Sequence, residues 1–491
     1  MKQGGSKAGQ WVKVGVALAL LCQTALTPVA WAQTPPPPAP AQPAAAGAPR
    51  SLPEALALAY STNSTLLAQR ANVRAVDENV PAALAGWRPT VTVSANAGYA
   101  NDNRITHTTL PSPRTSRTVV DRGLNAETIT ATQQLYSGGA TKAATNRAEN
   151  QVMAERGRLM AQEQATLLAS VQAYVGVIQS TQILALNVNN EQVLARQLQA
   201  TNDRFRVGEL TRTDVAQAEA ALSGATATRQ TAEGNLQTAR ATFRDTVGAL
   251  PGNLVEPQPL KLPVRTLEQA QAMARTNNPT VVAALFDDAA AKDSFDAQFA
   301  RLMPTLNLQA TYGRNEDTTA KNLQTNTGQI AAVLSLPLYQ GGVEYAAIRQ
   351  ARQAQQTTRQ KLDAARGTAV QQLAAAWATY GAAKSAIEST RQQVRANEIA
   401  LEGVQREALV GSRTTLDVLN AEQALLTSRT TLVQNLASLV TASYQVASGI
   451  GRLTARDLAL PVALYDETAY YNAVRNRLIG TSDYATEQPA R

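Results

Sequence analysis

The sequence of 491 residues predicts a membrane protein of mixed α and β structure, built from one unit of strands and long helices that occurs twice. Three observations support this fold class. Four sequence blocks recur in the same order in the two halves of the chain. Each half contains segments of about ten residues in which apolar and polar side chains alternate. Each half also contains a proline-free stretch rich in helix-forming residues, at 140–206 and 343–409.

The composition favours long helices over several ordinary globular cores. Aromatic residues make up 4% of the chain, whereas Ala, Gln, Thr and Asn are abundant, a mixture that suits helices packed through small side chains. The formal net charge is +8, but Lys and Arg are scattered among Asp and Glu and form no sustained basic run. The sequence therefore gives no support to nucleic acid as a partner.

Residues 1–32 have the pattern of a secretory signal peptide, with an early positive charge, a largely apolar stretch and the cleavage motif Ala30-Trp31-Ala32. Cys22 is an alternative site for lipid attachment. Leu21, however, stands where such a site needs a small residue, and the cleavage motif lies downstream. Signal cleavage would leave a chain without cysteine, so we expect no disulfides and no thiol nucleophile. No later segment has the unbroken apolar length of a membrane helix.

The repeated blocks define the predicted organisation of the chain. Blocks beginning at Leu52 and Pro89 recur 215 residues later, at Leu267 and Pro304. Blocks beginning at Leu135 and Val207 recur 203 residues later, at Leu338 and Val410, so one loop of the first copy holds about twelve extra residues. The expected segments are a signal peptide at 1–32, a Pro/Ala-rich linker at 33–50, a first repeat at 51–263, a second repeat at 264–452 and a C-terminal extension at 453–491.

Each copy opens with a short amphipathic helix, at 51–80 and 266–300, followed by a pair of strands. The first pair lies near 89–137, with a polar loop expected at 101–123, and the second pair lies near 304–339. The apolar side chains of the first strand share one face: Val91, Val93, Ala95, Ala97 and Tyr99. Polar side chains fill the other face, which is the period-two pattern of a strand. The second strand of each pair is expected at 124–136 and 328–339.

A Gly-Gly pair ends the alternation in each copy and introduces the long helical stretch. A helix of this length would measure about 100 Å at 1.5 Å per residue. Each long helix is expected to end at a Val-Gly turn and to return as a second helix, at 213–247 or 416–448. The predicted result is a pair of long helical hairpins of coiled-coil type.

The number of strands sets a condition on any membrane-embedded sheet. One chain supplies about four strands, whereas a closed membrane barrel needs about eight or more. Open strand edges cannot face lipid, because their backbone groups would lack hydrogen-bond partners. Several chains would therefore have to share one barrel, and three chains would supply twelve strands.

The duplicated motif Leu-Tyr-x-Gly-Gly, at 135–139 and 338–342, resembles the TolC family of outer-membrane efflux and secretion channels. The turn Val410-Gly411-Ser412-Arg413-Thr414-Thr415-Leu416-Asp417-Val418-Leu419-Asn420 resembles the same family, as does its first-copy partner at 207–215. The resemblance covers nearly all of 51–452. It implies a homotrimer with a twelve-stranded barrel in outer-membrane lipid and an α-helical barrel in the periplasm. It also implies a periplasmic adaptor (membrane-fusion) protein and an inner-membrane pump of ABC or RND type as partners.

The resemblance also implies roles for residues of the two Val-Gly turns. Asp417 and Asn420 align with the family's pore constriction, where Asn420 replaces a second acidic residue and so halves the charge of the ring. Arg413 aligns with an arginine that ties the inner hairpin to the outer one, with Thr213 and Asp214 as its partners. A companion tyrosine of this latch is replaced by Ala408.

The Val-Gly turns themselves are the expected adaptor-docking tips: Val207, Gly208, Val410 and Gly411. The resemblance implies that docking breaks the contacts of Arg413 and that the second-copy hairpins untwist to widen the entrance. From the residues alone, Asp417 and Asp214 have a simpler interpretation as acidic residues that stabilise a helix start.

The sequence gives no support to an enzyme or to a bound cofactor. His107 is the only histidine and lies in the polar segment beside Arg104 and Arg114, where a surface role is expected. No residues form a metal-ligating or triad pattern. Two alternative functions remain open, a periplasmic coiled-coil adaptor and an autonomous porin. The sequence does not identify the cargo or the pump.

Overall fold

The computed structural model describes residues 49–109, 111 and 114–481. The predicted signal peptide, nearly all of the linker and residues 482–491 of the C-terminal extension lie outside the described residues. The described residues belong to a single compact unit, Pro49–Arg491.

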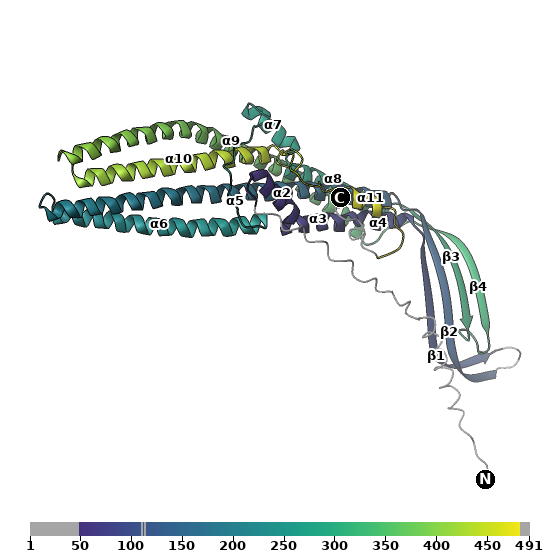
Figure 1. The fold of residues 1–491 in the computed structure, drawn as a ribbon. Helices are drawn as coiled ribbons and strands as arrows, with labels where there is room; N and C mark the ends of the chain where they lie inside the picture. The colour runs from purple at the N-terminus through teal and green to yellow at the C-terminus, as the bar shows by residue number, and fades with distance from the viewer. Residues whose placement is uncertain (1–48, 110, 112–113, 482–491) are drawn as a thin grey trace, which may run out of the picture. The chain divides into compact units, whose positions relative to one another are not determined.

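The first half of this unit begins with short helices, passes through a pair of strands and ends in two long helices (Figure 1). In order, the elements are α2 (Leu52–Thr62), α3 (Ser64–Asp77), α4 (Asn79–Leu84), η2 (Ala85–Trp87), β1 (Thr90–Thr108), β2 (Arg114–Tyr136), α5 (Ala140–Arg206) and α6 (Arg212–Val247).

The second half repeats this order with two changes: two helices, α7 and α8, precede the strands in place of α2, α3 and α4, and one short helix is added at the end. These elements are α7 (Leu267–Asn277), α8 (Pro279–Phe299), η3 (Ala300–Leu302), β3 (Thr305–Glu316), β4 (Gln324–Ser335), α9 (Val343–Leu409), α10 (Thr415–Gly449) and α11 (Ala469–Val474). The two long helices predicted at 140–206 and 343–409 are confirmed.

Glycine allows the chain to turn from each strand pair into a long helix. Gly139 and Gly342 stand at the N-caps of α5 and α9 with φ of 93° and 85°, in the left-handed region where other residues are strained. Gly138 has φ of 63° and also lies close to η3 of the second half. A Cβ atom at Gly138 would lie 2.8 Å from the carbonyl oxygen of Ala300. This turn therefore requires glycine for both its conformation and its packing.

Helix α5 packs along α6 and helix α9 along α10, forming two long hairpins (Figure 1). Buried side chains follow a seven-residue spacing along the seams, as in Ala218, Ala225 and Ala232 of α6. This spacing is the heptad pattern of a coiled coil, and the small side chains let the helices approach closely. The predicted coiled-coil hairpins are thus present in the single chain.

The main hydrophobic core lies where the short helices α2 and α3 meet α5, α6 and α10. Its largest fully buried side chains include Tyr174 and Phe243, whose ring centroids are 6.3 Å apart. Among the described residues, α5 is the one helix with a stretch long and apolar enough to cross a membrane, contrary to the sequence-based expectation. Leu167 and Val171 of α5 are nevertheless fully buried in this core, so this helix packs within the protein.

The four strands form one antiparallel sheet in the order β1-β2-β3-β4. The polar loop predicted at 101–123 is wrong, because β1 and β2 remain paired from Thr90↔Thr132 out to Thr108↔Arg114. Their outer part, beyond the end of β3, is a two-stranded ribbon. Its residues are polar because both faces meet solvent, and the Thr and Val side chains in it still favour a strand.

The last strand also differs from its predicted position. Strand β4 covers Gln324–Ser335 instead of 328–339, and it pairs with β3 from Thr305↔Ser335 to Glu316↔Gln324. Pro337 lies just beyond the end of the strand and has no backbone N–H to donate to the ladder. The apolar residues at 336 and 338 therefore lie outside the sheet.

The apolar face of the sheet is uncovered in the single chain. Val93 of β1 and Ile330 of β4 are 73% and 78% exposed, and Tyr99 and Leu334 are exposed on the same two edge strands. An apolar face of this extent is typical of a surface that meets lipid or a partner.

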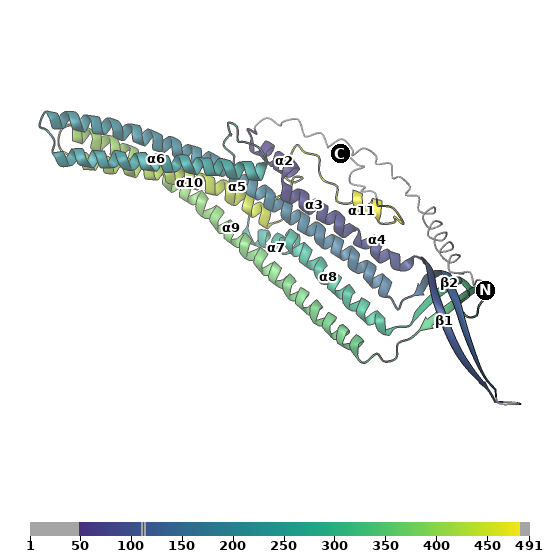
Figure 2. The same cartoon turned by 90° about the horizontal axis from the view of Figure 1, so that it is seen from below.

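After α10 the chain returns along the outside of the first half. Figure 2 shows α11 beside α3 and α4, and α11 contacts α3. The backbone N–H of Ala455 donates to Glu163 at 2.7 Å, and Arg88 donates to the carbonyl of Arg477 at 2.9 Å. The described part of the C-terminal extension is thus bound to the helices of the first half.

Candidate functional site

The turn between α5 and α6 is closed by a glycine and by a reciprocal cap. Gly208 adopts φ of 81°, which lets the chain leave α5. The backbone N–H of Asp214 donates to the Thr211 hydroxyl at 3.3 Å, and the backbone N–H of Thr211 donates to Asp214 Oδ2 at 2.9 Å. This capping box satisfies N–H groups at the start of α6 that no carbonyl can reach.

The turn between α9 and α10 has the same construction 203 residues later. Gly411 adopts φ of 79°, and Thr414 and Asp417 exchange the equivalent hydrogen bonds at 3.3 and 3.0 Å. Hydrogen bonds from the backbone and hydroxyl of Thr414 hold the pKa of Asp417 below its ordinary value. The Thr211 hydroxyl and backbone have the same effect on the pKa of Asp214. Both carboxyl groups therefore remain charged at neutral pH.

Each turn also carries an ion pair that joins the end of one helix to the loop. In the first turn Arg204 Nε lies 2.9 Å from Glu209 Oε2, and in the second Arg413 Nε lies 2.8 Å from Glu407 Oε2. Residues 204 and 407 occupy equivalent positions in the two hairpins but carry opposite charges. The two turns thus have similar backbone geometry. In the first turn the arginine lies on the helix and the glutamate in the loop, whereas in the second turn these positions are reversed.

The contact of Arg413 within the single chain leaves its predicted partners between hairpins untested. Among the described contacts of one chain, Arg413 pairs with Glu407, which lies in the same turn. Thr213 and Asp214 stay its predicted partners in an assembly of several chains. The hydrogen bond from Arg413 to Glu407 raises the pKa of the guanidinium. Sequence reasoning missed Glu407, although its charge, opposite to that of Arg204 in the first copy, was a usable signal.

The predicted pore residue Asn420 lies in a groove between the two hairpins of the chain. The groove has a volume of about 490 Å³ and is lined by α5, α6 and α10, including Leu194, Gln217 and Leu419. Asn420 is exposed, while Asp417 is partly exposed one helical turn nearer the tip. The tip itself presents apolar side chains to solvent, since Val207 is 72% and Val410 81% exposed.

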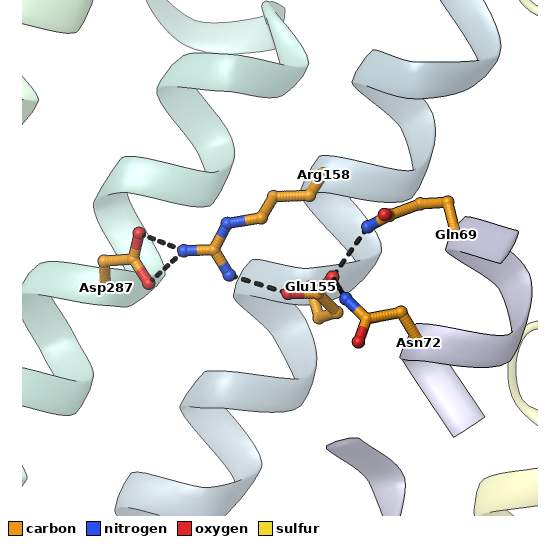
Figure 3. Close-up of polar contacts among 5 residues, drawn as sticks. All are labelled: Gln69, Asn72, Glu155, Arg158 and Asp287. Carbon is orange, nitrogen blue, oxygen red and sulfur yellow. Dashed lines mark hydrogen bonds and ion pairs between the residues drawn. The ribbon is translucent and has the colours of Figure 1, made fainter. Parts of the chain in front are cut away.

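A polar network joins the first half of the chain to the second (Figure 3). The buried carboxylate of Glu155 on α5 accepts hydrogen bonds from Gln69 and Asn72 of α3, both at 2.6 Å, and pairs with Arg158 at 2.8 Å. Arg158 also donates to both carboxylate oxygens of Asp287 on α8, at 2.6 and 2.8 Å. Three helices are thereby linked through one buried acid whose interactions are satisfied.

Close backbone packing supports this network at the α5–α8 contact. A Cβ atom added at Gly157 would lie 3.0 Å from the backbone nitrogen of Ala283. Asn150 of α5 donates to Asp293 of α8 at 2.7 Å, further along the same seam. Sequence reasoning did not find these residues, because their partners on α3 and α8 lie 83 or more positions away along the chain.

Residues 55–249 and 271–452 match the family model described as outer membrane efflux protein. The chain belongs to this family. The homologues are channel and transport proteins and not enzymes, and this member is an outer-membrane exit duct of the kind used in efflux or type I secretion. It resides in the outer membrane, with its helical part in the periplasm. The two alternatives considered from the sequence, a periplasmic adaptor and an autonomous porin, are therefore excluded.

Named relatives and solved structures agree with this membership. The chain is 35% identical over 427 residues to the outer membrane efflux protein BepC of Brucella suis, covering 87% of this chain and 91% of BepC. It is 27% identical over 375 residues to the outer membrane protein TolC of Vibrio cholerae, covering 74% of this chain and 83% of TolC. The crystal structure of the CmeC outer membrane channel of Campylobacter jejuni has the same fold, with a TM-score of 0.73 at 14% identity over 89% of this chain and 90% of CmeC.

Proposed function

We propose that three copies of this efflux protein assemble into one duct, with a twelve-stranded barrel in outer-membrane lipid and a helical barrel below it. The observation that carries the proposal is the four-stranded sheet with two unpaired edges, β1 and β4, and an exposed apolar face. Unpaired backbone groups are costly in lipid, so each edge needs a partner strand. Pairing of β1 with β4 of the next copy removes all edges when the ring closes.

Disulfide trapping tests this assembly. Thr90→Cys on β1 is combined in turn with Ala331→Cys, Val333→Cys or Ser335→Cys on β4, because these positions share the polar face of the sheet. At least one combination is expected to give a covalent trimer on denaturing gels without reductant. The matched control is Thr90→Cys with Thr132→Cys, which are paired within one chain and should give monomers. Absence of trimer from all three combinations would contradict the shared barrel.

The gate of the duct is proposed to lie at the second-half turns. In the closed assembly Arg413 binds Thr213 and Asp214 of a neighbouring hairpin, and one Asp417 from each copy forms a ring of charge at the constriction. Such a ring favours cations in a narrow pore, and Asn420 in place of a second acid weakens the effect. The capping boxes support this role, because they hold both carboxylates at defined positions beside the turns.

Removal of the latch should open the duct. Arg413→Ala leaves the capping box of Thr414 and Asp417 intact but removes the guanidinium, so the conductance of the purified channel in planar bilayers is expected to rise. Arg406→Ala, which removes an exposed arginine from the last turn of α9, serves as the matched control. Unchanged conductance of Arg413→Ala would contradict its role as a latch.

The exposed apolar tips support docking to a periplasmic adaptor of the membrane-fusion class. Val207 and Val410 are exposed beside Gly208 and Gly411, at the end of the helices farthest from the sheet (Figure 1). Contact between these tips and the adaptor would connect the duct to an inner-membrane pump of ABC or RND type. Docking is proposed to break the contacts of Arg413, so that the second-half hairpins untwist and the entrance widens.

A further inference from the structure

The second-half turn contains a partner for Arg413 that competes with the proposed latch. Glu407 lies at the end of α9, on the same hairpin as Arg413, and their side chains meet at 2.8 Å. The carbonyl of Glu407 also accepts hydrogen bonds from the backbone and hydroxyl of Ser412, both at 3.0 Å. The turn therefore keeps the backbone of Glu407 close to Arg413.

The neighbouring acid Asp417 cannot replace Glu407 without loss of structure. Asp417 Oδ2 accepts from the backbone and the hydroxyl of Thr414, at 3.0 and 2.8 Å, so a move toward Arg413 would open the cap of α10. Among the described contacts, the carboxylate of Glu407 accepts no hydrogen bond that caps a helix. The side chains of Glu407 and Arg413 are each 51% exposed. Exposed ion pairs contribute little to stability, so this pair can break at a small cost in free energy.

From these contacts we infer that Glu407 holds Arg413 within its own hairpin and so favours the open duct. This inference rests on the proposed latch. Arg413 has a single guanidinium, and the hydrogen bond that it donates to Glu407 through Nε orients the group toward its own turn. When Arg413 turns to the neighbouring hairpin the duct closes, and when it returns to Glu407 the latch is released. Glu407 thereby sets the balance between the two states.

The first hairpin provides an internal comparison. Its ion pair, Arg204 with Glu209, braces an equivalent turn at 2.9 Å, but Leu210 stands where the second hairpin has Arg413. The first turn therefore has a stabilising ion pair but no arginine at the position of the proposed latch. Loss of Glu209 should loosen that turn slightly and leave the gate unaffected, which makes Glu209→Gln the matched control.

Conductance in planar bilayers separates the two roles, because the variants should act in opposite directions. Glu407→Gln frees Arg413 for the latch and is expected to lower the conductance about two- to fivefold, the range expected for loss of an exposed ion pair. Glu407→Asp keeps the charge on a shorter side chain and should fall between wild type and Glu407→Gln. The double variant Glu407→Gln, Arg413→Ala should match Arg413→Ala alone, since Glu407 acts through Arg413.

The outcomes distinguish this inference from the proposed gate. If Arg413→Ala raises the conductance while Glu407→Gln leaves it unchanged or raises it, the role of Glu407 is overturned and the latch stands. If Glu407→Gln lowers the conductance equally in the Arg413→Ala background, the effect does not pass through Arg413 and the inference fails. If Arg413→Ala has no effect, the latch fails and the inference fails with it. Trimer migration on unheated gels verifies that each variant is assembled.

Discussion

At the residue scale, Asp214 and Asp417 illustrate how one side chain serves both folding and the proposed gate. Each carboxylate closes a capping box, and the hydrogen bonds of that box lower its pKa. A depressed pKa means that the cap stabilises the fold above the ordinary carboxyl pKa and loses this effect as the pH falls through the lowered value. The simpler interpretation of these acids as helix caps is thus confirmed, while the charge of the proposed ring is preserved.

Asp77 differs from Asp214 and Asp417 because its pKa is raised and not lowered. It is fully buried at the end of α3, and neither carboxylate oxygen has a hydrogen-bond partner within the described part of the chain. Loss of solvation raises its pKa to about 6; Arg156 and Arg74 oppose this shift, while Glu78 and Glu467 add to it. Because the folded-state pKa lies above the ordinary value, folding is favoured at low pH and the benefit disappears as the pH rises through 6.

Replacement of Asp77 by asparagine should remove the loss of stability that ionisation of the buried carboxyl group causes above pH 6. Protonated Asp and Asn are similar, so Asp77→Asn is expected to match wild type near pH 4 and to be more stable by up to about 3 kcal/mol near pH 7. Thermal unfolding of the purified protein between these pH values measures the difference. The exposed Asp245→Asn provides the control. A difference in stability that does not change with pH would argue against a buried, titrating Asp77.

At the element scale, the long helices were predictable and the outer strands were not. The starts of α5 and α9 depend on glycines at positive φ, and their ends depend on Val-Gly turns with Thr-x-x-Asp caps, which are all local signals. The outer part of β1 and β2 was taken for a loop because its residues are polar. Pairing across the ribbon, for example His107 with Thr115 at 3.0 Å, is a tertiary property that polarity does not reveal.

The seam between the two halves is a second feature that sequence periodicity could not predict. Glu155 occupies a buried position on α5, and its partners come from α3 while Arg158 connects it to α8. A buried acid is stable only when its charge and hydrogen bonds are satisfied, and only the folded chain brings these partners together. This seam lies closer to the sheet than the Val-Gly turns, as Figure 1 indicates for α3, α5 and α8.

At the scale of the whole molecule, the proposed assembly and docking use surfaces that a single chain leaves exposed. The two sheet edges are proposed to pair with other copies, and the apolar helix tips are proposed to meet the adaptor. These surfaces lie at opposite ends of the described unit, so assembly and docking can be tested separately (Figure 1).

A charge placed on the apolar tips should separate docking from assembly. The double variant Val207→Asp, Val410→Asp is expected to form the trimer normally and to lose cargo export in cells, because the adaptor contact would have to bury the new carboxylates. Val255→Asp alters an exposed valine away from the tips and should retain export. Normal export by the double variant would show that these valines are not part of the docking contact.

Local signals in the sequence were sufficient to define the order of strands and helices, the helical hairpins, the Val-Gly turns and the family. Helix caps, glycines at positive φ and alternating or heptad spacing act over a few residues, so they can be recognised without the fold. Only the tertiary structure decided the reach of the β1–β2 ribbon, the partners of Glu155 and the pairing of Arg413 with Glu407. These features depend on which side chains lie within hydrogen-bond distance, and several similar charges compete for each position until the chain is folded.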